Sequence, residues 1–167
     1  MRCFLGIDVG AYRKAFEKID VPLQESVQPV KNYHITLNFW PDLDERTRTQ
    51  VSTRIVTFNH APFDVQLDTI MAFPSVQAPE LYALSTSDPH GLVALRSALQ
   101  HHIGVKFSDH FRPHITLARK EKVTPGSCAE QVARITPLTI TIDSVALFES
   151  RPEQGMNTYF SQVTYFS

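Results

Sequence analysis

The pattern of hydrophobic and polar residues predicts short strands and amphipathic helices in alternation. Apolar residues recur every three or four positions over 11–20, 51–58 and 92–99, which is the spacing of one helix face. Apolar runs, or strict alternation with polar residues, predict strands over 3–9, 33–39, 63–67, 81–84, 113–119, 138–142 and 157–166. A further short helix is expected near Ala129–Ile135.

Helix-ending and helix-capping residues fit these boundaries. Pro22 ends the first helical stretch, and Pro41 ends the strand before the second. Asp42 or Asp44 can cap the second helix, because a short carboxylate accepts a hydrogen bond from the first free backbone N–H groups. Asp88-Pro89 begins the third helix in the same way.

Two of the predicted strands contain the same word, His-Ile-Thr-Leu, at His34–Leu37 and at His114–Leu117. Side chains alternate faces along a strand, so the histidine and threonine of each copy point one way and the isoleucine and leucine point the other. The two copies are therefore predicted to present imidazoles and hydroxyls on one face and to bury their apolar residues in a core.

The copies are offset by 80 positions, from residue 34 to residue 114. The same offset moves the first helix, Ala11–Asp20, onto Gly91–Gln100 within the third. This agreement predicts two pseudo-equivalent strand–helix–strand units, roughly 1–75 and 76–167, whose histidine strands face one another across a groove.

Length and composition favour a single soluble domain, or two small lobes that share a core. The chain has 167 residues, of which 43% are hydrophobic and 20% charged. The formal net charge of −1 provides no global basic field, so any contact with RNA must be local. Cys3 and Cys128 lack a paired spacing, which argues against a disulfide scaffold or a thiolate zinc site. With no signal peptide and no bilayer-spanning run recognised, we expect a cytoplasmic protein that does not contact membranes.

Two imidazoles favour acid–base chemistry. The histidine pKa of about 6.5 lets one neutral ring accept a proton from water while a second, protonated ring gives one to a leaving oxygen. Threonine hydroxyls beside them can donate to anionic oxygens. A phosphodiester, above all a cyclic one, fits these groups best. Both rings can contact one phosphate if their nitrogens lie on the order of 5–7 Å apart.

Phe39 and Arg119 occupy equivalent places, each five residues after its histidine. An aromatic face and a guanidinium can hold a nucleobase by stacking and cation–π attraction. An odd offset, however, points to the opposite face of a regular strand. The alternative is that Phe39 belongs to the core and Arg119 to the surface, unless the strands bend or end there.

A metal site is the other use of two histidines, but it needs at least one further ligand. No His-x-His spacing occurs near either motif, and the His-x-x-x-His spacing found there joins His110 to His114. His110 stands four residues before His114 and is more simply explained as a solvated loop residue. The sequence therefore predicts no metal and no cofactor.

With both motifs in hand, the chain resembles the two-histidine (2H) phosphoesterases, and more narrowly the RNA 2′,3′-cyclic phosphodiesterases, historically called 2′-5′ RNA ligases. The resemblance covers essentially the whole chain. It rests on the two His-x-Thr words and on residues 2–7, Asn38-Phe39, Phe73-Pro74, Pro113, Ala118-Arg119, residues 147–150 and Tyr159. Relatives often have Lys-Phe-Leu-Gly where this chain has Asn38-Phe39-Trp40-Pro41.

The resemblance implies a bilobal α+β fold in which antiparallel sheets line a central cleft and helices lie outside. It places His34, Thr36, His114 and Thr116 around the phosphate. It also implies metal-independent hydrolysis of an RNA-terminal or nucleotide 2′,3′-cyclic phosphate to a 2′-phosphomonoester. His114 would activate water and His34 would protonate O3′, although the sequence does not fix this division. The partner is then an RNA end or a small cyclic nucleotide, and we expect a monomer.

Two alternatives follow from the same residues. The chain could act on 2′-5′ linkages or another nucleotide-derived phosphodiester, by cleavage or by ligation. It could also be an RNA-end-binding module without turnover, although binding alone needs no matched acid and base.

Overall fold

The computed structural model describes residues 1–22, 26–123, 128–153 and 156–167. In chain order the elements are β1 (Cys3–Asp8), the 3₁₀ turn η1 (Gly10–Tyr12), α1 (Arg13–Phe16), β2 (Gln28–Pro29), β3 (His34–Trp40), α2 (Glu45–Ile55), β4 (Phe63–Phe73), β5 (Leu81–Ser85), α3 (His90–Ile103), β6 (His114–Arg119), β7 (Glu130–Ile142), β8 (Ser144–Glu153) and β9 (Met156–Tyr165).

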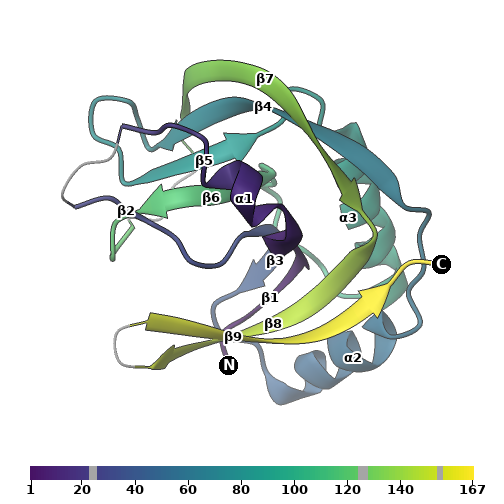
Figure 1. The fold of residues 1–167 in the computed structure, drawn as a ribbon. Coiled ribbons are helices and arrows are strands. Elements are labelled where there is room, and N and C mark those ends of the chain that lie inside the picture. The colour runs from purple at the N-terminus through teal and green to yellow at the C-terminus, as the bar shows by residue number, and fades with distance from the viewer. Residues whose placement is uncertain (23–25, 124–127, 154–155) are drawn as a thin grey trace.

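The strands form one open antiparallel sheet in the order β7-β4-β5-β6-β3-β1-β8-β9, and β2 pairs with β6. The two arms of this sheet, β7 to β6 and β3 to β9, meet where β3 pairs with β6 through Ile35 and Ile115. Figure 1 shows both arms curving and the helices α2 and α3 together on one side of the sheet. The predicted α+β class, with antiparallel strands and outer helices, is confirmed. The division into two halves near residue 75 stays a prediction.

The main core lies between the sheet and the pair α2–α3. Leu92, Leu95, Leu99 and Ile103 form the buried stripe of α3, as predicted for the first three. This stripe packs with Val51 and Ile55 of α2 and with the buried residues of the central strands. The helices α2 and α3 therefore cover one face of the sheet.

The helix ends follow their capping residues. Asp44 is the N-cap of α2, since its carboxylate accepts from the backbone N–H of Thr47 at 2.9 Å. Gly104 ends α3 in the left-handed region, with φ of 73°. At the start of α3, Asp88 accepts from the N–H of His90 at 3.3 Å, and Pro89 is the N-cap. No helix within the described ranges combines the length and the apolar character needed to cross a membrane.

The first predicted helix is shorter than its apolar stripe. Only Arg13–Phe16 is α-helical, after the 3₁₀ turn η1. The N–H groups of Lys18 and Ile19 bond three residues back, to Ala15 and Phe16, so the chain tightens into turns. The apolar stripe still contributes to the core, because Phe16 is buried in the core cluster and Ile19 packs against that cluster.

The predicted helix near Ala129–Ile135 is wrong, because residues 130–135 belong to strand β7. The pairing of β7 with β4 shifts register between Leu67 and Thr69 and again between Ile70 and Met71. The extra residues in β7 turn the usual two-residue repeat into inward positions three apart, at Val132, Ile135 and Leu138. That spacing imitates a helix face.

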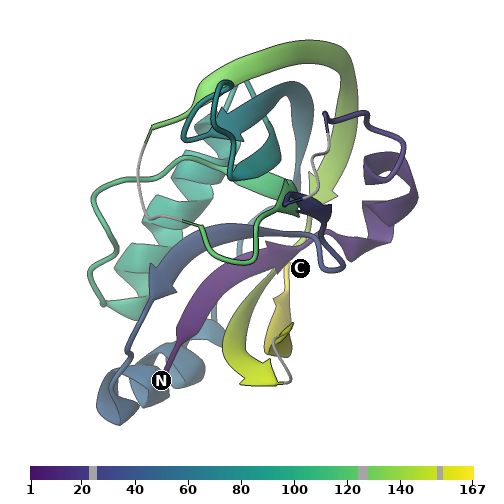
Figure 2. The same ribbon diagram turned by 90° about the vertical axis from the view of Figure 1, so that its left-hand side faces the viewer.

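Strand β8 has no counterpart among the predicted elements. Its residues 144–150 are all buried, so they show no alternation of apolar and polar positions. The strand packs between β1 and β9. Figure 2, in which the left-hand side of Figure 1 faces the viewer, shows β1 and β3 side by side, and both strands lie in the middle of the strand order.

Candidate active site

The central strand pair brings the two His-Ile-Thr-Leu words together. Ile35 lies directly opposite Ile115 in an antiparallel pair. Continued by one residue each way, this register sets His34 across from Thr116 and Thr36 across from His114. Residues directly opposite share a face, so all four side chains point the same way, while both isoleucines are fully buried on the other side. We call the first side the histidine face. The two histidines are diagonal neighbours, a relation that sets Cα atoms about 7–8 Å apart.

Each histidine strand also carries a bulge at the same place. In β3, Leu5 pairs with Asn38 and Gly6 with Thr36, which leaves Leu37 without a partner. In β6, Tyr82 pairs with Ala118 and Ala83 with Thr116, which leaves Leu117 without one. Both pairs of strands thus hold one extra residue at matching positions, 80 apart in the chain.

The bulges bring Phe39 and Arg119 back to the histidine face. Phe39 pairs with Phe4, whose ring lies 4.8 Å from the ring of His34. Arg119 pairs with Leu81, which pairs in turn with Phe73, and the ring of Phe73 lies 5.1 Å from that of His114. The objection from strand parity is therefore removed: Phe39 is exposed and Arg119 half-buried on the same face as the histidines.

The carbonyl of each bulge is hydrogen-bonded from the other half of the chain. Arg96 of α3 donates from Nε to the carbonyl of Leu37 at 2.7 Å. The backbone N–H of Val30 donates to the carbonyl of Leu117 at 3.1 Å. Because a buried carbonyl without a partner is costly, these two bonds help to fix both bulges.

Arg96 also ties the first bulge to the loop that precedes His114. Its Nη2 donates to the carbonyl of Ser108 at 2.6 Å. The backbone N–H of Ser108 donates to Oδ1 of the buried Asn38 at 2.9 Å. The guanidinium lies over the rings of Phe107 and Phe111, at 5.4 and 4.8 Å from their centroids. Arg96 thus positions both histidine strands without lying on the histidine face.

His114 is held in one orientation by its own loop. Its Nδ1 lies 2.9 Å from the carbonyl of Arg112, to which a protonated Nδ1 donates. In the neutral ring this bond leaves the lone pair on Nε2. Ser85, opposite His114, donates to the carbonyl of Pro113 at 2.8 Å and fixes the turn into β6. Burial lowers the pKa of His114, so the ring favours the neutral form that can accept a proton.

His34 lies in a more complex electrostatic environment. Its pKa falls to about 4, first because of burial and then because of charge on His114 and Arg119, while the carboxylate of Asp8 opposes this change. The influence of His114 shows that the two imidazoles are electrostatically coupled. Charge on His114 therefore disfavours protonation of His34.

Aromatic rings form the wall of the site around His34. Phe4 and Phe148 stack at 4.6 Å, and the ring of Phe148 lies 6.1 Å from that of His34. Arg2 lies over the ring of Phe39, 5.2 Å from its centroid. Phe4 and Asp8 could have been found from the sequence, since they lie four residues apart in β1 and therefore on the same face. Arg2 and Arg96 gave no such signal.

Gly6 allows this close packing. It pairs with Thr36, and a Cβ atom there would come within 2.6 Å of the carbonyl oxygen of Ile35. The absence of a side chain lets β1 approach β3 beside the motif.

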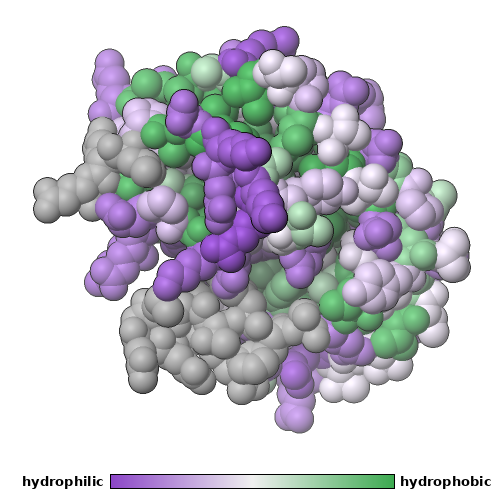
Figure 3. Space-filling model, viewed as in Figure 1, coloured by the Kyte–Doolittle hydropathy of each residue, from purple (hydrophilic) through white to green (hydrophobic). Residues whose placement is uncertain are grey.

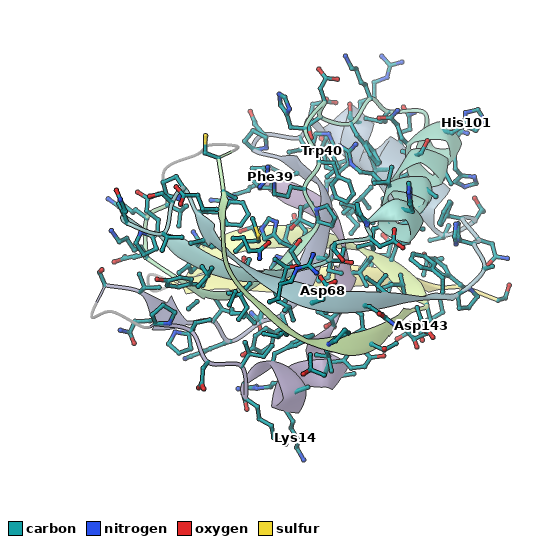
Figure 4. The ribbon with its side chains drawn as sticks, turned by 90° about the horizontal axis from the view of Figure 1, so that it is seen from above. Lys14, Phe39, Trp40, Asp68, His101 and Asp143 are labelled. Atoms are coloured by element: carbon teal, nitrogen blue, oxygen red, sulfur yellow. The ribbon has the colours of Figure 1, made fainter. Side chains whose placement is uncertain are left out.

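Another hollow has a lining that includes neither His34 nor His114. It has a volume of about 580 Å³ and is lined by Asp64, Gln66, Asp68, Ser87 and Asp88, among others. Figure 4 places Asp68 away from Phe39 and Trp40. Asp68 accepts from the backbone N–H and the hydroxyl of Ser87. Within the part of the chain that the structure describes, no group of three or more His, Cys, Asp or Glu residues is arranged to hold a metal ion.

Comparison with known proteins identifies a family and several relatives. A family model described as the 2′-5′ RNA ligase superfamily matches residues 16–153. A protein of Archaeoglobus fulgidus named RNA 2′,3′-cyclic phosphodiesterase is 24% identical over 136 residues, covering 75% of this chain and 76% of its own. A protein of the same name from Thermotoga maritima is 24% identical over 164 residues, covering 90% and 87%.

Solved structures share the fold. The structure of E. coli LigT in its apo form has a TM-score of 0.72 at 22% identity and covers 99% of this chain and 97% of that one. A structure described as that of a phosphoesterase has a TM-score of 0.74 at 21% identity and covers 99% and 98%. At these identities the likeness shows the fold of the chain.

Proposed function

The chain belongs to the 2′-5′ RNA ligase superfamily, and on this basis we propose that it hydrolyses 2′,3′-cyclic phosphates at RNA ends or on nucleotides. The product is a 2′-phosphomonoester, and the reaction needs no metal. The observation that carries the proposal is the antiparallel pairing of Ile35 with Ile115, which sets two coupled histidines on one face. The names of the curated relatives agree with this substrate class.

The proton transfers follow from the two environments. His114, with its Nδ1 bound to a carbonyl, accepts a proton from water at Nε2. The water oxygen attacks phosphorus, and the bond from phosphorus to O3′ breaks. His34 in its protonated form donates to O3′; burial and the charge on His114 lower its pKa to about 4, and the Asp8 carboxylate opposes that change. The products are a 3′-hydroxyl and a 2′-phosphate, and proton exchange with solvent restores both rings.

The remaining residues of the histidine face bind the substrate. Thr36 and Thr116 donate hydrogen bonds to the non-bridging phosphate oxygens, whose charge grows in the transition state. Arg119 supplies positive charge to the same oxygens. Phe39, with Arg2 across its ring, offers a stacking surface for the base.

The direct test is hydrolysis of a nucleoside 2′,3′-cyclic phosphate by EDTA-treated protein, with the product identified by phosphorus NMR. We expect a 2′-phosphomonoester from the wild type. His34→Asn and His114→Asn should each lower kcat by about 10²–10⁴-fold, the usual contribution of a positioned acid or base. The exposed His101 offers a matched control, His101→Asn, which should retain full activity. Either site variant that kept near-wild-type turnover with an intact fold would rule out the paired mechanism.

The same assay separates the alternatives. A binding module would retain the cyclic nucleotide without converting it. An enzyme for 2′-5′ linkages would leave the cyclic phosphate intact and cleave, or form, a 2′-5′ dinucleotide. Cytoplasmic location and a monomeric state stay predictions.

A further inference from the structure

A pocket of about 330 Å³ opens beside His34 and extends beyond the residues that the proposed reaction uses. Its lining includes Asp8, Arg13, Lys31, Asn32, Tyr33 and Phe148 around His34. These residues come from the end of β1, from α1, from the chain entering β3 and from β8. His34 lies between this pocket and β6, so the pocket extends the site on the side away from His114.

Two cations give this pocket its chemical character. Arg13 donates from Nε to Glu17 at 2.6 Å, and that bond uses one of the five guanidinium donors. Lys31, which also lines the pocket, is exposed. Figure 3 shows hydrophilic side chains gathered over the position of α1. An anionic group is the ligand that such a lining fits.

The other polar groups leave room for an anion. Asp8 is the acid of the lining, and its Oδ1 is turned back to accept from the N–H of Gly10 at 2.8 Å. The pKa of Tyr33 is raised, first by burial and then by Glu17, so its hydroxyl stays protonated. Tyr33 and the Asn32 amide are neutral groups that can donate hydrogen bonds to an anion.

The chemistry of ribose indicates which anion reaches this pocket. The ring carbon that carries O3′ is bonded to the carbon that carries the 5′ arm. If His34 protonates O3′, the 5′ arm of the terminal nucleoside leaves the site on the His34 side, toward Arg13 and Lys31. The RNA chain therefore continues over this pocket and away from His114.

We propose that this pocket binds the phosphate on the 5′ oxygen of the terminal nucleoside, which in RNA is the last 3′-5′ phosphodiester. The inference rests on the proposed function and narrows its substrate to an RNA 3′ end in preference to a free cyclic nucleotide. Single-stranded nucleic acids are held in this way, by local cationic grooves that follow the backbone. A local cluster suits a chain whose net charge is only −1.

The test compares three substrates: adenosine 2′,3′-cyclic phosphate, its 5′-phosphorylated form, and the ApA dinucleotide ending in a 2′,3′-cyclic phosphate. We expect both phosphate-bearing substrates to have at least tenfold higher kcat/KM than the first. The ratio of kcat/KM for a phosphate-bearing substrate to kcat/KM for adenosine 2′,3′-cyclic phosphate should fall about fivefold for a tenfold rise in salt. The reason is that one phosphate contact on a single strand contributes a slope of about −0.7 to the plot of log affinity against log salt concentration.

Matched variants locate the effect. Arg13→Gln and Lys31→Gln should each reduce the preference for the phosphate-bearing substrates about three- to tenfold. Lys14→Gln removes the same charge from the same helix, on a side chain that points away from the molecule in Figure 4, and should leave the preference unchanged. Glu17→Gln should preserve the preference, which separates loss of the Arg13 charge from loss of its ion pair.

The outcomes distinguish the two proposals. If adenosine 2′,3′-cyclic phosphate is hydrolysed but the three substrates react alike, or if only the dinucleotide gains, the phosphate pocket is wrong and the proposed function stands. If no cyclic phosphate is hydrolysed by folded protein, both fall.

Discussion

The strand pairs β1–β3 and β5–β6 share a scaffold and differ in chemistry. Gly6 pairs with Thr36 as Ala83 pairs with Thr116, and each pair is followed by a bulged leucine. Yet Asp8 lies opposite His34 where Ser85 lies opposite His114. The repeated geometry brings the two imidazoles together, and the unlike neighbours give them unlike roles.

The same contrast holds five residues after each histidine. Phe39 and Arg119 have equivalent places, but one is an exposed ring and the other a half-buried cation. A symmetric site would bind the two ends of its substrate alike. This one offers charge on one side and a stacking surface on the other, which suits a phosphate attached to a nucleoside.

Of the substitutions that test the difference between Phe39 and Arg119, the one at Arg119 should have the larger effect. Arg119→Gln should lower kcat/KM about 100-fold, because it removes charge stabilisation of the phosphate oxygens. The change also removes one cause of the lowered pKa of His34, so that pKa rises and the alkaline limb of the activity profile moves to higher pH.

Phe39→Leu is the matched variant on the other strand. It should raise KM about tenfold through lost stacking and leave the pH profile in place. Steady-state kinetics across pH would measure both variants. Equal effects of the two substitutions on KM, with no movement of either profile, would contradict the division of roles.

A smaller effect should follow from loosening one bulge and not the other. Arg96→Met leaves the carbonyls of Leu37 and Ser108 without their donor. We expect the free energy of unfolding to fall by about 2 kcal/mol. KM should also rise, because the loosened bulge no longer fixes Phe39 on the histidine face. Arg54→Met, on the exposed side of α2, is the control and should change neither. Urea denaturation and kinetics of the same samples would show whether stability and KM move together; an unchanged KM would limit Arg96 to a structural role.

The smallest expected effect is a pH dependence of stability. The folded-state pKa of His34, about 4, lies below its ordinary value, so the unfolded chain binds more protons as pH falls through the window from about 6.5 to 4. The contribution of His34 to the free energy of unfolding is fully present above pH 6.5 and is lost as pH falls. Between pH 7 and pH 5 the loss should be about 1–2 kcal/mol. Urea denaturation of His34→Asn should show a flatter pH dependence than wild type, and an equally steep one would contradict the lowered pKa.

The sequence could predict the strands that carry the site, because both words have an unambiguous alternation and flanking prolines. It could not predict the bulges, since the Leu37-Asn38 and Leu117-Ala118 pairs carry no signal for an extra residue. That is why strand parity gave the wrong face for Phe39 and Arg119. Strand β7 looked helical for the same reason, because register shifts against β4 gave it a period near three.

Residues that act across the fold were also beyond sequence reasoning. Arg96 reaches the Leu37 carbonyl from 59 positions away, so no local pattern could indicate the contact. Strand β8 hid Phe148 in a run buried on both faces. Tertiary contacts decided these features, and only the folded chain shows them.

The most direct test of the central claim is a crystal structure with a nucleoside 2′-phosphate bound. If the paired words act together, Nε2 of His34 and Nε2 of His114 will each lie about 2.6–3.2 Å from an oxygen of the ligand's reaction centre, on opposite sides of one phosphorus atom. A phosphate bound by one histidine alone, or at a site that neither ring contacts, would contradict the account.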